Sequence, residues 1–162
     1  DLDRAPLDLS RLLIDAVSDA HAAGPDHEWS LDLPDEPVQV LGDAARLHQV
    51  VANLLANARA HTPPSTRVQV SLASDAAGHA VVTVSDDGPG IPAELQPLLF
   101  ERFARGDSSR SRAAGSTGLG LAIVRAVVTG HGGTVTVESE PGRTTFRVEL
   151  PALARKGEGS GE

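Results

Sequence analysis

The stretch QVVANLLANARAHTP, residues 49–63, combines the pattern of a core-facing helix with two asparagines four residues apart. The apolar residues of this helix recur at helical spacing and predict one buried stripe, made of Leu47, Val50, Val51, Leu54, Leu55 and Ala58. Asn53 and Asn57 lie beside the stripe, one turn apart. Asparagine in a helix interior is about 0.5 kcal/mol less favourable than alanine, because its amide competes for backbone hydrogen bonds. The pair therefore indicates a polar site next to the core.

The composition is that of one globular domain. The chain has 162 residues, 40% of them hydrophobic, which is enough for one core. No apolar run approaches the ~18 residues that span a bilayer, and the N-terminus lacks the pattern of a signal peptide. We therefore expect no membrane contact from this chain. The absence of cysteine excludes disulfides and thiolate metal sites, and the net charge of −8 argues against a nucleic-acid partner.

The basic residues are almost all arginine. Of the 14 lysines and arginines, only Lys156 is a lysine, and it lies in the C-terminal segment ARKGEGSGE. Walker A loops and eukaryotic-type protein kinases place a lysine on the phosphates. A nucleotide site in this chain would have to use arginine, backbone N–H groups and a metal ion instead.

Hydrophobic periodicity and turn residues predict helices interleaved with strands. Asp43 is the expected N-cap of the second helix, and residues 75–78 are expected to close a hairpin. The pattern predicts one mixed sheet with helices on one face. The expected helices are 9–23, 44–61, 93–100 and one from 118, and the expected strands are 28–33, 38–42, 66–74, 79–86, 134–140 and 144–151.

The segment VSDDGPGIP, residues 84–92, places Asp86 at the end of a strand with Gly88 and Gly90 behind it. A carboxylate there can accept a hydrogen bond from an exocyclic amine, and glycines let a flat ring approach the backbone. Aspartate, glycine and proline are also the usual residues of an ordinary turn. Both interpretations remain open for this segment alone.

Two further segments have features of a phosphate site. GSTGLGLAIV, residues 115–124, is a glycine-rich helix entry without the Rossmann spacing, and free N–H groups at such a helix start attract phosphate. LFERFARGD, residues 99–107, has Phe100 and Phe103 at core spacing. Residues 104–117 lack any large apolar residue, which predicts either a solvated loop or a lid whose arginines contact phosphate.

In chain order, the segments NLLANARAH, DDGPGIP, LFERFARGD and TGLGLAIV resemble the N, G1, F and G2 boxes of the catalytic ATP-binding (HATPase) domain of bacterial sensor histidine kinases. The resemblance implies the α/β sandwich of the gyrase, chaperone and histidine kinase ATPases (Bergerat fold), with about five strands and helices on one face. It also implies an ATP-binding domain over residues 24–151. Residues 1–23 would continue from a dimerisation domain or begin this one, and residues 152–162 would be a flexible tail.

The resemblance also implies roles for individual residues. Asn57 would hold Mg²⁺ on the phosphates of ATP, and Asp86 would bind the adenine amine. Thr145 would help to close the adenine pocket. The other implied nucleotide contacts are His61, Gly88, Gly90, Ile91, Arg105, Gly118, Leu119, Gly120 and Leu121. His61 stands near the family's usual basic position, so the basic group that contacts the phosphates remains open between His61 and nearby arginines.

Asn53 occupies the position at which related ATPases carry a glutamate that activates water. An amide cannot accept a proton from water at neutral pH, so this resemblance implies ATP binding without efficient hydrolysis. The γ-phosphoryl group would then be kept for a histidine. None of the six histidines has the sequence context of a phosphate acceptor. The implied partners are a separate histidine-containing dimerisation domain and, indirectly, a response regulator, with a cytoplasmic location and a parent protein in the inner membrane.

Two alternatives remain open. An anti-sigma-type serine kinase shares the fold, although the F box and the helix before Pro34 favour a histidine kinase. A non-catalytic nucleotide-sensing module would bind ATP without transferring a phosphoryl group, and it would not need a metal-binding asparagine. The presence of Asn57 favours the kinase.

Overall fold

The main layer of the molecule is a five-stranded mixed sheet, described by a computed structural model for residues 2–101 and 118–153. The outer pair β2 and β4 is parallel, and the other neighbouring strands are antiparallel. This arrangement confirms the mixed sheet expected from the sequence. The order across the sheet is β2 (Glu28–Asp32), β4 (Arg67–Ser74), β5 (His79–Asp86), β7 (Arg143–Pro151) and β6 (Thr134–Glu140).

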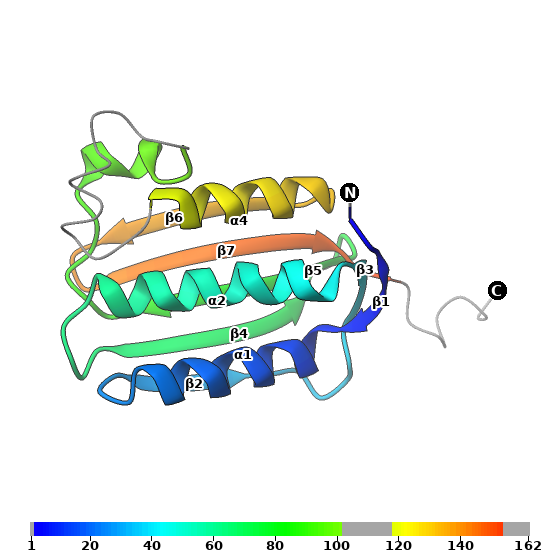
Figure 1. Ribbon diagram of the computed structural model, residues 1–162, viewed down its shortest axis with the longest axis horizontal. Coiled ribbons are helices and arrows are strands. Elements are labelled where there is room, and N and C mark those ends of the chain that lie inside the picture. Colours follow the sequence, from blue (N-terminus) through cyan, green and yellow to red (C-terminus); the bar gives the residue numbers. More distant parts are fainter. Residues whose placement is uncertain (1, 102–117, 154–162) are drawn as a thin grey trace.

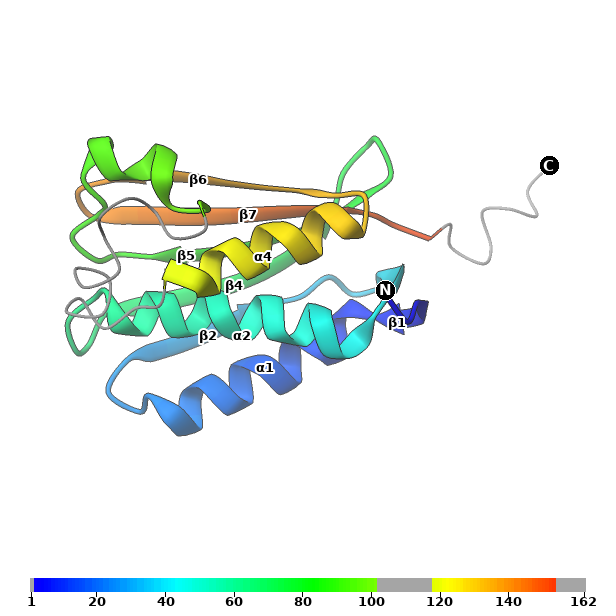
Figure 2. The same ribbon diagram turned by 45° about the horizontal axis from the view of Figure 1, so that its top comes forward.

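Three helices form a second layer on one face of this sheet (Figures 1 and 2). They are α1 (Leu9–Ala23), α2 (Ala44–Ala60) and α4 (Gly118–Gly130), and α2 packs between the other two. No helix of the described residues covers the opposite face. None of these helices combines the length and apolarity that crossing a membrane requires.

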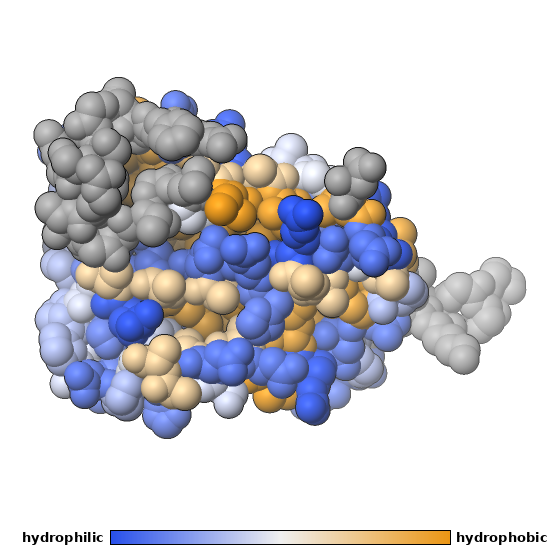
Figure 3. Space-filling view, viewed as in Figure 1, coloured by the Kyte–Doolittle hydropathy of each residue, from blue (hydrophilic) through white to orange (hydrophobic). Residues whose placement is uncertain are grey.

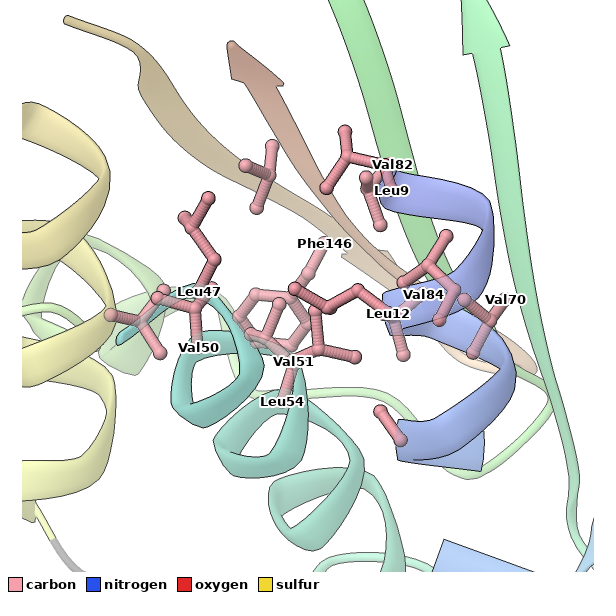
Figure 4. Close-up of a cluster of buried hydrophobic side chains, with 14 of the residues drawn as sticks. Leu9, Leu12, Leu47, Val50, Val51, Leu54, Val70, Val82, Val84 and Phe146 are labelled. Carbon is pink, nitrogen blue, oxygen red and sulfur yellow. The ribbon is translucent and has the colours of Figure 1, made fainter. Parts of the chain in front are cut away.

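The core lies between the two layers (Figure 4). The predicted stripe of α2 is buried along its whole length, and each of its six residues is at most 5% exposed. It packs against apolar side chains of α1 and against Val70, Val82, Val84 and Phe146 of the sheet. Phe100 packs on the core, as predicted, and meets Phe146 edge-on with ring centroids 6.0 Å apart. Phe103 lies outside the described residues.

The ends of α2 are fixed by the residues that the sequence indicated. The Asp43 carboxylate accepts a hydrogen bond from the Arg46 N–H at 3.2 Å, which is the geometry of an N-cap. At the other end, the His61 N–H donates to the Asn57 carbonyl at 3.1 Å. Two prolines follow at 63 and 64 and stop the helix. These residues fix where α2 begins and ends, and with it the position of Asn53 and Asn57, which we call the polar column of α2.

The structure differs from the expected elements in two places. A short strand β1 (Ala5–Asp8) pairs with β3 (Gln39–Gly42) in a separate two-stranded sheet. Strand β1 was not predicted, because Pro6 lowers its strand propensity, although proline is accepted on an edge strand. Residues 93–98 form a 3₁₀ helix, η1 (Ala93–Leu98), instead of an α-helix, and Pro97 lies inside it.

Candidate nucleotide site

The helix-covered face of the sheet changes from apolar to polar at one end. Asp86, Thr144 and Ser139 are direct neighbours across β5, β7 and β6. They continue the face that carries Val84 and Phe146, because side chains alternate along a strand. The Ser139 and Thr144 hydroxyl oxygens lie 2.6 Å apart, and Thr144 is only 4% exposed. Asp86, Thr144 and Ser139 therefore form a polar row on the face of the sheet that elsewhere packs against the helices as core.

Asp86 is half-buried at the end of β5. Its Oδ1 accepts a hydrogen bond from the Gly88 N–H at 3.0 Å, and no other hydrogen bond reaches the carboxylate from residues 2–101 or 118–153. Burial raises the pKa of Asp86 and the neighbouring Asp87 raises it further, while the Gly88 N–H and the imidazoles of His27 and His61 act in the opposite direction. Oδ2 is thus an acceptor held away from bulk water, which suits an amine donor.

The loop after β5 depends on its glycines for steric reasons. Gly90 has a φ of +93°, and a Cβ there would come within 2.7 Å of the Glu140 carbonyl oxygen. A Cβ on Gly88 would come within 2.5 Å of the Thr62 Cγ2 atom. The ordinary turn interpretation therefore explains Gly90 fully, without a ligand. Ile91, which packs on the core, donates its N–H to Ser139 Oγ at 2.8 Å and ties the loop to the polar row.

The C-terminal half of α2 brings its polar column to the same end of the molecule as Asp86 (Figure 1). Asn53 Nδ2 donates to the Gly120 carbonyl in the first turn of α4 at 3.1 Å. The half-buried Asn57 carboxamide has no hydrogen-bond partner within the described part of the chain. Desolvation lowers the pKa of His61, whereas the nearby Asp86 charge raises it. Asn57 is therefore an unpaired polar group on α2, one turn after Asn53, which contacts α4, and one turn before His61, which feels the charge of Asp86.

The first turn of α4 lies beside α2, and the helix starts where the glycine-rich segment predicted. The helix begins at Gly118, and its Gly120 carbonyl contacts Asn53. Leu121 is 7% exposed and packs into the core, so only its backbone is available to a ligand. The side chain of Leu119 and the whole of Arg105, like the predicted lid over 104–117 and the tail from 154, lie outside the described residues.

The prediction for Thr145 is wrong by one residue. Thr145 lies on the sheet face away from the helices, where its hydroxyl is 2.9 Å from that of Ser85. Its neighbour Thr144 is the residue that pairs with Asp86 on the helix-covered face. Counting by twos from the buried Phe146 would have selected Thr144, since side chains two apart share a face. Sequence reasoning also missed Ser139, which has no local motif.

The surface on the helix side is uneven (Figure 3). Apolar residues of α4 form an orange band, and polar residues follow the helices below it. The C-terminal end of α2, the start of α4 and the end of β5 lie at the same end of the molecule (Figure 2). Three elements that are distant in sequence thus contribute to one site.

Comparison with known proteins agrees with this geometry. The family model described as "Histidine kinase-, DNA gyrase B-, and HSP90-like ATPase" matches residues 42–154. The chain therefore belongs to this family. The probable sensor histidine kinase TcrY of Mycobacterium tuberculosis is 67% identical over 150 residues, which make up 93% of this chain and 31% of that protein. TrcS, a sensor histidine kinase of the same organism, is 49% identical over 160 residues, 96% of this chain and 31% of that protein.

Solved structures show the same architecture. The mycobacterial sensor histidine kinase MprB matches with a TM-score of 0.79 and 34% identity, over 94% of this chain and 99% of that one. The ATP-binding domain of PrrB from Mycobacterium tuberculosis matches with a TM-score of 0.75 and 33% identity, over the same shares. The expected fold is confirmed, and the chain is an ATP-binding catalytic domain of the sensor histidine kinase type. It spans about a third of the length of the two curated relatives.

Proposed function

We propose that this chain is the phosphoryl-donor domain of a sensor histidine kinase, which binds ATP with Mg²⁺ and donates the γ-phosphoryl group to a histidine on a dimerisation domain. The observation that carries the proposal is the meeting of a polar sheet row, an unpaired asparagine on α2 and the first turn of α4 at one end of the core. Buried polar groups are costly unless they find partners. A nucleotide with its metal ion supplies partners for the Asn57 carboxamide and for the second carboxylate oxygen of Asp86.

The base end of the site is formed by the sheet. Oδ2 of Asp86 accepts a hydrogen bond from the adenine amine, because Oδ1 is already used by the Gly88 N–H. The Thr144 and Ser139 hydroxyls line the floor beside it, and Ile91 supplies an apolar wall. This end discriminates between an amino and a keto group at the same position of a purine.

The phosphate end is formed by the helices. Backbone N–H groups at the start of α4 and its dipole attract the phosphates, which removes the need for a lysine. Asn57 has the oxygen ligand that Mg²⁺ prefers and no competing partner in the described part of the chain. Bound there, the ion would neutralise charge on the phosphates. His61 and Arg105 are the proposed basic contacts beside them.

The proposed partner is the histidine-containing dimerisation domain of the parent kinase, and a response regulator receives the phosphoryl group afterwards. The curated relatives are sensor kinases about three times as long as the matched part. A parent protein in the inner membrane, with this domain on the cytoplasmic side, fits such a sensor. The net charge of −8 does not favour nucleic acid.

Nucleotide titration by calorimetry tests the binding part of this proposal. We expect ATP to bind with a dissociation constant between about 1 μM and 1 mM, more weakly when EDTA replaces Mg²⁺. GTP should bind at least about tenfold more weakly than ATP, because its keto group cannot donate to Asp86. Equal affinities for ATP and GTP would contradict the assignment of Asp86.

Substitution of Asn53 tests why the site would transfer the γ-phosphoryl group rather than hydrolyse ATP. Asn53→Glu introduces a carboxylate where the related ATPases carry their base, and general-base assistance contributes about 10²- to 10⁴-fold. We expect phosphate release to rise at least about tenfold. This is less than the full range, because the new side chain loses the hydrogen bond to Gly120. Asn53→Gln is the matched control, with the same length and no base. A similar rise in both variants would show that the missing base is not the cause.

A further inference from the structure

His27 is a buried histidine, and its neighbours decide which ring nitrogen donates a hydrogen bond. It is 7% exposed, and its Nε2 lies 2.8 Å from Thr62 Oγ1. Thr62 Oγ1 lies 2.7 Å from the Ala58 carbonyl oxygen, which can only accept. The single hydroxyl proton of Thr62 is used in that bond, so His27 Nε2 must be the donor to Thr62. The other ring nitrogen, Nδ1, is buried without a hydrogen-bond partner in the described part of the chain.

Thr62 connects this histidine to the loop that follows Asp86. The Thr62 Cγ2 methyl group lies directly over Gly88, where an added Cβ would be only 2.5 Å away. The Gly88 N–H is the group that donates to Asp86 Oδ1 at 3.0 Å. A continuous set of contacts therefore runs from His27, beside β2, through the end of α2 to the carboxylate at the end of β5.

We propose that His27 and Thr62 are positioning residues for adenine selection, and this inference rests on the proposed function of Asp86. The bond from His27 holds the Thr62 hydroxyl, and the threonine methyl group presses on Gly88. Gly88 in turn keeps one carboxylate oxygen occupied and leaves the other aimed at the 6-amino group of the base. Neither residue needs to touch the nucleotide.

The two functional groups of Thr62 can be removed separately. Thr62→Ser keeps the hydroxyl and removes the methyl group over Gly88, whereas Thr62→Val keeps a methyl group and removes the hydroxyl. His27→Leu removes the donor, and His27→Gln retains an N–H at a similar distance. His48→Leu is a matched control on the N-terminal half of α2, where His48 Nε2 lies 3.5 Å from the exposed Asp19 carboxylate.

The measurement is the ratio of affinities for ATP and inosine triphosphate, which differs from ATP by a keto group in place of the 6-amino group. We expect the ratio to fall at least about threefold in Thr62→Ser, Thr62→Val and His27→Leu, and to be retained in His27→Gln and His48→Leu. A general loss of structure would weaken both nucleotides equally and leave the ratio unchanged. If His27→Leu does not fold, the two Thr62 variants carry the test.

The Asp86→Ala variant separates this inference from the proposed function. When Asp86→Ala is combined with a Thr62 or His27 substitution, the ratio of ATP to inosine triphosphate affinity should change no further, because the carboxylate that these residues position is absent. If Asp86→Ala leaves the ratio of the unmodified protein unchanged, the proposed function of Asp86 fails. If Asp86→Ala abolishes the preference for ATP while Thr62→Ser, Thr62→Val and His27→Leu retain it, the positioning role alone is wrong.

Discussion

Replacement of Asp86 by asparagine is expected to weaken ATP binding about 10- to 100-fold and to invert the preference between ATP and inosine triphosphate. A hydrogen bond to a charged group contributes about 1.5–3 kcal/mol, and about 1.4 kcal/mol corresponds to tenfold in affinity. The Gly88 N–H requires an acceptor at Oδ1, so the asparagine must turn its NH₂ group towards the base. That group opposes the adenine amine and donates to a keto oxygen.

The same variant should fold at least as stably as the original protein. Burial raises the folded-state pKa of Asp86 above its ordinary value of 3.8, so the ionised carboxylate lowers the free energy of unfolding. For a raised acid pKa this cost is present above the folded-state pKa and disappears below 3.8. We therefore expect thermal unfolding of ligand-free Asp86→Asn to occur at an equal or higher temperature at neutral pH, with the difference vanishing in acid.

The pH dependence of ATP binding is a second test of whether the ionised Asp86 carboxylate binds the adenine amine. Only the ionised carboxylate accepts the adenine amine without competition from its own proton. ATP affinity should therefore fall as the pH drops through the raised pKa, before an ordinary aspartate would be protonated. Asp86→Asn should lack this acid limb. A lower melting temperature for Asp86→Asn together with unchanged ATP affinity would reassign Asp86 to a structural role.

Replacement of Asn57 by alanine is expected to reduce phosphoryl transfer by more than about 100-fold. A metal ligand on the transferring phosphates contributes several kcal/mol of transition-state stabilisation, and each 1.36 kcal/mol is about tenfold in rate. The variant should not lose stability. The Asn57 carboxamide has no hydrogen-bond partner in residues 2–101 and 118–153, and alanine is a better helix former than asparagine by about 0.5 kcal/mol. Transfer rates and thermal unfolding measured together separate these effects.

Asn57→Asp is the matched control for this experiment. It keeps an oxygen ligand at the same position and should restore transfer in part, with a stronger dependence on Mg²⁺ concentration. Arg11→Ala removes an exposed arginine of α1 that pairs with Asp15, and this variant should retain full transfer. If Asn57→Ala transfers at the original rate, the metal lies elsewhere in the site.

The helix that carries the asparagines was the part of the site most readable from sequence. Its apolar stripe fixes which face meets the sheet, so the positions of Asn53 and Asn57 beside the core follow from a period of 3.6 residues. Asp86 was identifiable for a similar reason, since apolar and polar residues alternate over the second half of the strand that it ends. Local periodicity was sufficient where one element alone determines the position of a side chain.

Residues that depend on pairing between elements were not readable in this way. Thr144 and Thr145 are adjacent and chemically alike, and only the register of β5 and β7 assigns Thr144 to the side of Asp86. His27 and Thr62 are 35 positions apart, and their hydrogen bond depends on how β2 lies beside the end of α2. The partner of β3 was missed because a four-residue strand containing proline has too little pattern of its own.

The most direct test of the donor role supplies the domain with γ-labelled radioactive ATP, Mg²⁺ and a separate histidine-containing dimerisation domain from a related sensor kinase. We expect the label to appear on the acceptor histidine, with little release of free phosphate, and we expect Asn57→Ala to abolish the labelling. Rapid release of phosphate by the domain alone, with no label on the acceptor, would contradict the donor role and would make the protein an ATPase of the same fold.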